Sequence, residues 1–149
     1  EWCAHSGHLC PIPDKQIATA FMWKAALHAR ETGGISLVLP YGTLFHHSDS
    51  ALTFQRAFIA RHAVDHVLNL TDYQFFLFAE ARHPAVVVTY RPMPPPSPLH
   101  RIEYWAPKTD WLVKRAELMI ISPEDRNTFS TGDVLDDLAK PRLHRRPAG

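Results

Sequence analysis

Long apolar runs are absent from this 149-residue chain, and so is a strong excess of charge of either sign. No run approaches the roughly 20 residues that a membrane-spanning helix needs, and the first residues carry no signal-peptide pattern. The net charge is only +1, so the overall charge does not indicate a nucleic-acid partner. From these absences we expect a cytoplasmic protein that is not associated with a membrane.

Cysteine is scarce as well, since Cys3 and Cys10 are the two in the chain. His5 and His8 lie between them, and thiolates and imidazoles are the side chains that bind zinc. The spacing matches no common zinc module, and the two inner side chains would be crowded onto one short loop. We therefore interpret the segment as a polar loop and expect no metal, with zinc binding as the open alternative.

The composition is that of a globular domain, because 46% of the residues are hydrophobic and 21% are charged. The spacing of the apolar residues predicts helices that alternate with strands. Helices are predicted at 15–30 and 51–61, with Asp14 and Ser50 as N-caps, and strands at 35–40, 64–70 and 85–90. The first helix is apolar around much of its circumference, which is typical of a helix packed on a sheet. This order of elements predicts an α/β fold.

A connection at 93–98, with four prolines in six residues, separates this region from the rest of the chain. Beyond it the pattern predicts further short elements: strands at 101–105 and 118–122, a helix from Thr109 or Asp110 to Ala116, and another helix starting at Ser122-Pro123. The tail at 140–149 is basic and contains no acidic residue, and we interpret it as a solvated end.

A resemblance to a known family begins in the run Gly33-Gly34-Ile35-Ser36-Leu37-Val38-Leu39-Pro40-Tyr41-Gly42-Thr43-Leu44-Phe45. This run is similar to the fifth strand of the N6-adenine DNA methyltransferase family, to which the type I restriction-modification methyltransferase subunits belong. Residues 14–21 resemble the helix that follows the family's catalytic loop, and residues 76–78 with 85–88 resemble the hairpin that closes its sheet. The order and spacing of these motifs over residues 10–92 carry the resemblance.

The resemblance implies a fold and an activity. The fold is a partial class I AdoMet-dependent methyltransferase sheet, which is Rossmann-like. In it the strand at 85–90 runs antiparallel between those at 35–40 and 64–70, and the two helices pack on opposite or adjacent faces. The activity is methylation of adenine N6 in DNA with S-adenosyl-L-methionine, in a restriction-modification or phage-defence system. The implied partners are DNA and a specificity subunit or recognition domain.

The family's catalytic and cofactor-binding motifs do not occur in this sequence. It has no Asn-Pro-Pro followed by an aromatic, and Gly33-Gly34 ends a helix, whereas the AdoMet-binding loop opens one. We therefore expect residues 1–92 to be the C-terminal half of a catalytic domain, 93–98 a connection, and 99–149 an extension that leads out of the domain. AdoMet is expected to bind mainly to an upstream half, so the chain alone should be inactive.

An enzyme that methylates adenine N6 must first take the base out of the duplex, and an aromatic side chain can stack on the flipped base. The family resemblance places such an aromatic at Phe78, with Phe76 as the alternative. A third interpretation is that Phe75, Phe76 and Phe78 are all core residues beneath a loop.

Tyr41 and Phe45 follow a predicted parallel strand at its carboxyl end, where ligands bind in open α/β sheets. We expect them to line the substrate cleft, although they could equally pack the following helix onto the sheet. His46, His47 and Asp49 are interpreted as polar loop residues, since no third metal ligand lies at a suitable spacing.

Two other functions fit the same sequence. One is a non-catalytic or degenerate methyltransferase-like module that binds DNA or a protein partner. The other is a class I methyltransferase that acts on RNA or protein, because the last strands look alike across that fold. An Asn-Pro-Pro-aromatic motif encoded shortly upstream would favour the adenine methyltransferase.

Overall fold

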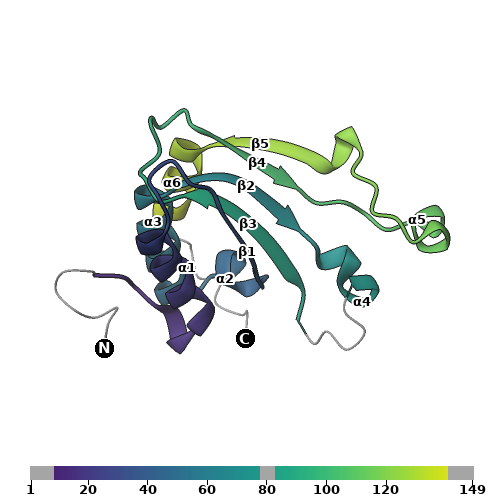
Figure 1. Ribbon diagram of the computed structural model, residues 1–149, viewed down its shortest axis with the longest axis horizontal. Helices are drawn as coiled ribbons and strands as arrows, with labels where there is room; N and C mark the ends of the chain where they lie inside the picture. The colour runs from purple at the N-terminus through teal and green to yellow at the C-terminus, as the bar shows by residue number, and fades with distance from the viewer. Residues whose placement is uncertain (1–8, 78–82, 141–149) are drawn as a thin grey trace, which may run out of the picture.

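A five-stranded mixed sheet, in the order β1-β3-β2-β4-β5, forms the centre of the computed structural model, which describes residues 9–77 and 83–140 (Figure 1). The strands are β1 (Ile35–Pro40), β2 (Ala63–Asn69), β3 (Ala85–Arg91), β4 (Arg101–Trp105) and β5 (Arg126–Ser130). The helices are α1 (Ile17–His28), α2 (Gly42–Phe45), α3 (Asp49–Arg61), α4 (Gln74–Leu77), α5 (Trp111–Ala116) and α6 (Thr131–Ala139). Short 3-10 turns lie at η2 (Pro13–Lys15), η3 (Thr71–Tyr73) and η4 (Pro123–Asp125).

The position of β3 confirms the predicted topology. It pairs antiparallel with β1 on one side and with β2 on the other, so β1 and β2 run parallel to each other. Its sequence is rich in β-branched residues, which suits a strand with a partner on each side. The sheet then continues through β4, which is parallel to β2, and β5, which is antiparallel to β4. The fold is therefore mixed α/β.

The two long helices, α1 and α3, cover one face of the sheet. On β3 this face carries Val86, Val88 and Tyr90, all of them fully buried. Tyr90 contacts both helices, because its hydroxyl donates a 2.7 Å hydrogen bond to the carbonyl oxygen of Met22 in α1 and its ring lies 4.9 Å from that of Phe58 in α3. The two helices therefore lie side by side on the same face, and Figure 1 shows them together at one end of the molecule.

The two long helices begin and end at other residues than predicted. Asp14 lies in η2 with a φ of 45° and does not cap α1, which starts after Gln16 and ends at His28, well before Gly33-Gly34. The N-cap of α3 is Ser48 rather than Ser50, since the Ser48 side chain accepts a hydrogen bond from the Ala51 amide. Ser50 instead donates to the Asp14 carboxylate at 3.3 Å.

One predicted strand and one predicted helix in the second half of the chain are wrong. Residues 118–122 form no strand, and the helix start at Ser122-Pro123 stops after the single turn of η4. The turn has its capping box, but residues 126–130 are extended because they pair with the whole length of β4. The helix α5 follows the prediction, with the Asp110 carboxylate accepting a 2.8 Å hydrogen bond from the Val113 amide.

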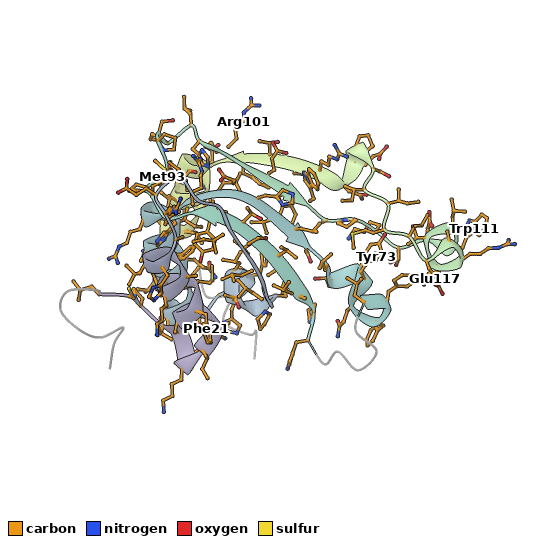
Figure 2. All side chains as sticks on the ribbon, viewed as in Figure 1. Phe21, Tyr73, Met93, Arg101, Trp111 and Glu117 are labelled. Carbon is orange, nitrogen blue, oxygen red and sulfur yellow. The ribbon has the colours of Figure 1, made fainter. Side chains whose placement is uncertain are left out.

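The end of the molecule far from α1 and α3 is formed by α4 and α5 (Figure 1). Trp111 and Glu117 lie at its tip (Figure 2), and Trp111 is 71% exposed. Within residues 9–77 and 83–140, none of the helices is long and apolar enough to cross a membrane.

Candidate functional site

The carboxyl ends of β1, β2 and β4 meet at one end of the sheet because these three strands run in the same direction. Ligands of open α/β sheets bind at this end, since the loops that follow the strands converge there. In this chain the converging segments are α2, η3 with α4, and the connection from β4 to α5. The residues of these segments are therefore the candidates for a functional site.

Tyr41 and Phe45 stand together at the end of β1. Their rings stack with centroids 4.5 Å apart and planes 13° from parallel, because the single turn of α2 brings residues four apart onto one side. The Tyr41 amide donates a 2.8 Å hydrogen bond to the carbonyl of Pro84, which fastens this loop to the start of β3. Phe45 also meets the edge of Tyr104 in β4 at 6.0 Å, so it packs toward the core face.

Side-chain hydrogen bonds join the ends of β2 and β4. The Asn69 amide donates a 2.8 Å hydrogen bond to the hydroxyl of Tyr104, while its carbonyl oxygen accepts from the Thr71 amide at 3.0 Å. Asn69 therefore fixes both the neighbouring strand and the start of η3. No local pattern indicates this pair, because its members lie 35 positions apart.

Tyr73 anchors the loop that follows β2. It is fully buried, and its hydroxyl lies 3.3 Å from the Lys108 carbonyl and 3.4 Å from the Ile120 amide. The neighbouring Asp72 carboxylate accepts a 3.0 Å hydrogen bond from the Thr109 amide. The two loops at this end of the sheet are thus held together, and Figure 2 shows Tyr73 beside α4, on the side of the segment that leads to α5.

Phe75 and Phe76, which follow Tyr73, are not core residues. Phe75 is 80% exposed and Phe76 is 40% exposed. The ring of Phe76 meets the ring of Tyr73 edge-on, with centroids 6.1 Å apart, so a buried residue supports it while part of its surface remains open. Phe78, the other candidate for base stacking, lies outside the described residues.

Metal-binding groups are not brought together in the described part of the chain. Among those residues, no three His, Cys, Asp or Glu side chains are placed to hold a metal ion. Cys3, His5 and His8 lie outside them. The His46 ring is 3.2 Å from the Ser48 hydroxyl, so it supports the start of α3.

A polar and aromatic cluster on the uncovered face of the sheet was not foreseen from the sequence. The ring of His66 lies edge-on to that of Trp105 at 4.3 Å, and the Arg126 guanidinium stands 4.8 Å from the centre of Trp105. Nε2 of His66 and Nε1 of Trp105 are buried and make no hydrogen bond within the described residues. Burial lowers the pKa of His66, and the nearby Glu103 opposes this only partly, so the ring is neutral at pH 7.

Asp65 and its partners have a structural role. The strand β2 has an irregular register between Val64 and His66, which places Asp65 toward β3. There Arg91 forms a two-pronged ion pair with its carboxylate at 2.9 and 3.0 Å, and this contact raises the pKa of Arg91. Nε2 of His100 is 3.2 Å from the same carboxylate and 3.0 Å from the Val64 carbonyl. These contacts of His100 hold the end of the proline-rich connection against β2.

Comparison with known proteins identifies the fold. One similar structure is the methyltransferase subunit of a type I restriction-modification system from Streptococcus thermophilus, with a TM-score of 0.51 and 17% identity over 85% of this chain. Another comes from work on complex assembly and conformational transition of the type I system, with a TM-score of 0.51 and 15% identity over 80% of this chain. The described chain has a methyltransferase-like fold.

The chain spans only part of these proteins, namely 25% of the first and 30% of the second. No protein-family model matches the sequence, and no curated protein matches it. The likeness in structure therefore establishes the fold of this segment.

Proposed function

We propose that the chain is the C-terminal part of the catalytic domain of an AdoMet-dependent DNA methyltransferase that modifies adenine N6 in a restriction-modification or phage-defence system. The observation that carries the proposal is the insertion of antiparallel β3 between parallel β1 and β2, in a fold shared with type I methyltransferase subunits. Two of the motifs that resemble the N6-adenine family lie in these strands, residues 35–40 in β1 and residues 85–88 in β3.

In this proposal the described residues do not hold AdoMet. Gly33 and Gly34 lie between α1 and the amino end of β1, whereas a cofactor-binding glycine loop follows the carboxyl end of a strand and opens a helix. The cofactor, which supplies the methyl group, would be held by another part of the protein. What this chain can contribute is the surface that receives the base.

The free edge of β1 is where another part of the protein fits best. Among the described strands β1 pairs only with β3, so its other edge is open. A groove of about 530 Å³ runs between α1 and β1, and Phe21 and Val38 on its walls are 60% and 63% exposed. A further parallel strand with its helix would extend the sheet here and cover these apolar side chains, as strand addition does at exposed sheet edges.

In this proposal the aromatic residues at the carboxyl end of the sheet receive the flipped adenine. Phe78 or Phe76 stacks on the base, and Tyr41 with Phe45 borders the cleft. The partial exposure of Phe76 and its support by Tyr73 favour such a role, because a stacking platform needs an open π-face in a fixed position. Each stacked base contributes about 1–3 kcal/mol, which would offset part of the cost of flipping.

The proposed partners are DNA and a specificity subunit or recognition domain. Support comes from the similar structures, which belong to type I restriction-modification systems, one of them studied for its complex assembly. In this proposal the recognition of a DNA sequence belongs to that subunit or domain.

The test is made on the longer protein that contains this chain. Its coding sequence should hold an Asn-Pro-Pro-aromatic motif within about 40 codons upstream of Glu1, since the helix that follows the catalytic loop in the family corresponds to residues 14–21. The purified protein should transfer a labelled methyl group from AdoMet to adenine N6 in DNA, and replacement of the motif's Asn by Ala should abolish transfer. The chain alone should give no heat of binding on titration with AdoMet.

Two results would contradict the proposal. Methylation of RNA or protein, but not of DNA, would assign the chain to another class I methyltransferase. A longer protein that lacks the motif and binds DNA or a protein without methylating it would be a degenerate methyltransferase-like module.

A further inference from the structure

A second groove, of about 570 Å³, lies on the helix-covered side of the sheet between α3 and α6. Its floor is formed by β2, β4 and β5, and α2 closes one end. It is separate from the groove along β1, because the two share no residue. Phe45, which borders the proposed substrate cleft, also lines one end of this second groove, and the proposed chemistry gives the rest of the groove no role.

The floor of this groove is aromatic and only partly covered. Phe45 meets Tyr104 at 6.0 Å, and Tyr104 meets Phe129 at 6.2 Å, so three rings follow one another across it. Phe129 in β5 is 46% exposed, whereas Ile102, its direct partner in β4, is 6% exposed. A large apolar side chain on the core face of a sheet is therefore open to solvent, which is typical of a surface that another molecule covers.

The rim along α6 is acidic. Asp133 and Asp137 line the groove, and the nine residues of α6 contain a third acid, Asp136, and no base. The one lysine on the rim, Lys140, lies 3.5 Å from the Asp137 carboxylate, in a pair so exposed that solvent screens most of its attraction. This edge therefore favours a cationic partner and disfavours the phosphates of a nucleic acid.

We propose that this groove is a docking site for a basic amphipathic helix of a protein partner. The apolar stripe of the helix would lie on Phe129, Tyr104 and the apolar residues of α6, in the manner of other helix-in-groove complexes. Its lysines and arginines would face Asp133 and Asp137, with their aliphatic stems across the aromatic floor. The inference does not depend on adenine methylation, so it can fail while the proposed function stands.

The probe is a labelled helical peptide of about 15 residues, long enough to form helix once bound. It carries leucines at the i, i+3, i+4, i+7 spacing with lysine and arginine beside them, and a matched peptide carries glutamate at the basic positions. Fluorescence anisotropy with the full chain should show micromolar binding of the basic peptide and none of the acidic one. Binding should weaken as salt is raised, because the rim charges are exposed.

Two neighbouring aspartates of α6 supply a matched pair of variants. Asp137→Asn, which removes a charge from the rim, should weaken peptide binding about fivefold. Asp136→Asn removes the same charge from the same helix outside the groove lining and should leave binding unchanged. Phe129→Ser should weaken binding about tenfold while the melting temperature changes little, since the ring is half exposed.

Several outcomes would overturn the inference. Equal binding of the two peptides, or an equal effect of Asp136→Asn and Asp137→Asn, would show that the peptide only adheres to an acidic surface. If the basic peptide does not bind, the groove is not a docking site for a basic amphipathic helix. Binding that develops only after residues 141–149 are deleted would assign the groove to the chain's own basic tail.

Discussion

Phe58 is the side chain whose loss should be most damaging to this fold. It is fully buried in α3, and its ring lies 5.2 Å from Trp23, 4.5 Å from His62 and 4.9 Å from Tyr90. These neighbours belong to α1, to the end of α3 and to β3, so Phe58 joins the two long helices to the sheet. Phe58→Ala would open a cavity at the point where all three elements meet.

The expected cost follows from that burial. Truncation of a buried phenylalanine to alanine costs about 3–5 kcal/mol, and aromatic pairs add about 0.5–1.5 kcal/mol each beyond the area that they bury. Because Phe58 has several ring neighbours in the core, we expect Phe58→Ala to lower the free energy of unfolding by about 4–5 kcal/mol. For a chain of this length that corresponds to a fall in melting temperature of about 10–20 °C.

The matched control is Phe75→Ala, the same chemical change at a side chain that is 80% exposed. It should alter the free energy of unfolding by no more than about 0.5 kcal/mol. Urea unfolding of the chain and of both variants, followed by circular dichroism, measures the two effects under one set of conditions. A Phe58→Ala loss below about 1 kcal/mol, or equal losses for the two variants, would refute the packing of α1 and α3 on the β3 face.

Three further predictions follow from single contacts. Tyr90→Phe removes the hydroxyl that donates to Met22 and should cost about 1 kcal/mol in urea unfolding, and an unchanged midpoint would mean that this bond is not formed. Burial lowers the pKa of His62 below 6.5, so the folded chain binds fewer protons than the unfolded chain and its stability should fall as the pH drops below 6.5. The variant His62→Gln should show a smaller fall in melting temperature over the same pH range. Equal pH profiles of melting temperature for the two proteins would contradict this prediction. In the longer enzyme, Phe76→Ala should weaken DNA binding by about 1–3 kcal/mol with little change in melting temperature, whereas a large loss of stability with normal binding would make Phe76 a packing residue.

The order of the central strands could be predicted from the sequence because local patterns and a family resemblance agreed on it. The strands at 35–40, 64–70 and 85–90 each combine an apolar run with clear turn signals, and the structure has β1, β2 and β3 at those places. Boundaries were less predictable, since Ser48 and Ser50 are equally good caps by composition. In the structure Ser48 is the cap, and Ser50 donates a hydrogen bond to Asp14 in a distant turn.

The strand β5 could not be predicted from local sequence. Its residues Arg126–Ser130 follow a good helix start, and four of the five are exposed, so neither a helical nor a strand pattern of burial is present. They become extended because β4 offers an edge along which all five residues pair. Pairing with a distant segment overrode the local helix signal, and such pairing is invisible in the order of the residues.

The candidate site shows the same division. The place of Tyr41 and Phe45 after a parallel strand makes them candidates from sequence alone, and the structure brings the two rings into a stack. Asn69 and Tyr73 were not predicted, because their role depends on hydrogen bonds to residues far along the chain. Asn69 donates to Tyr104, and Tyr73 donates to the carbonyl of Lys108. Single residues that follow strands can thus be predicted from order alone, whereas the hydrogen bonds that hold two loops together require the fold.

The edge of β1 and the open groove beside α6 differ in a way that bears on what covers each. The strand β1 contains no charged residue, although natural proteins protect exposed sheet edges with charge, proline or short length, and only its last residue is a proline. The absence of such protection at this edge of β1 is consistent with permanent pairing to another strand of the same sheet. The rim along α6 carries Asp133 and Asp137 beside its apolar floor, and exposed charge of this kind keeps a partly apolar surface soluble in the absence of a partner. The uncharged edge therefore suits permanent burial within one domain, and the charged groove suits association between separately folded molecules.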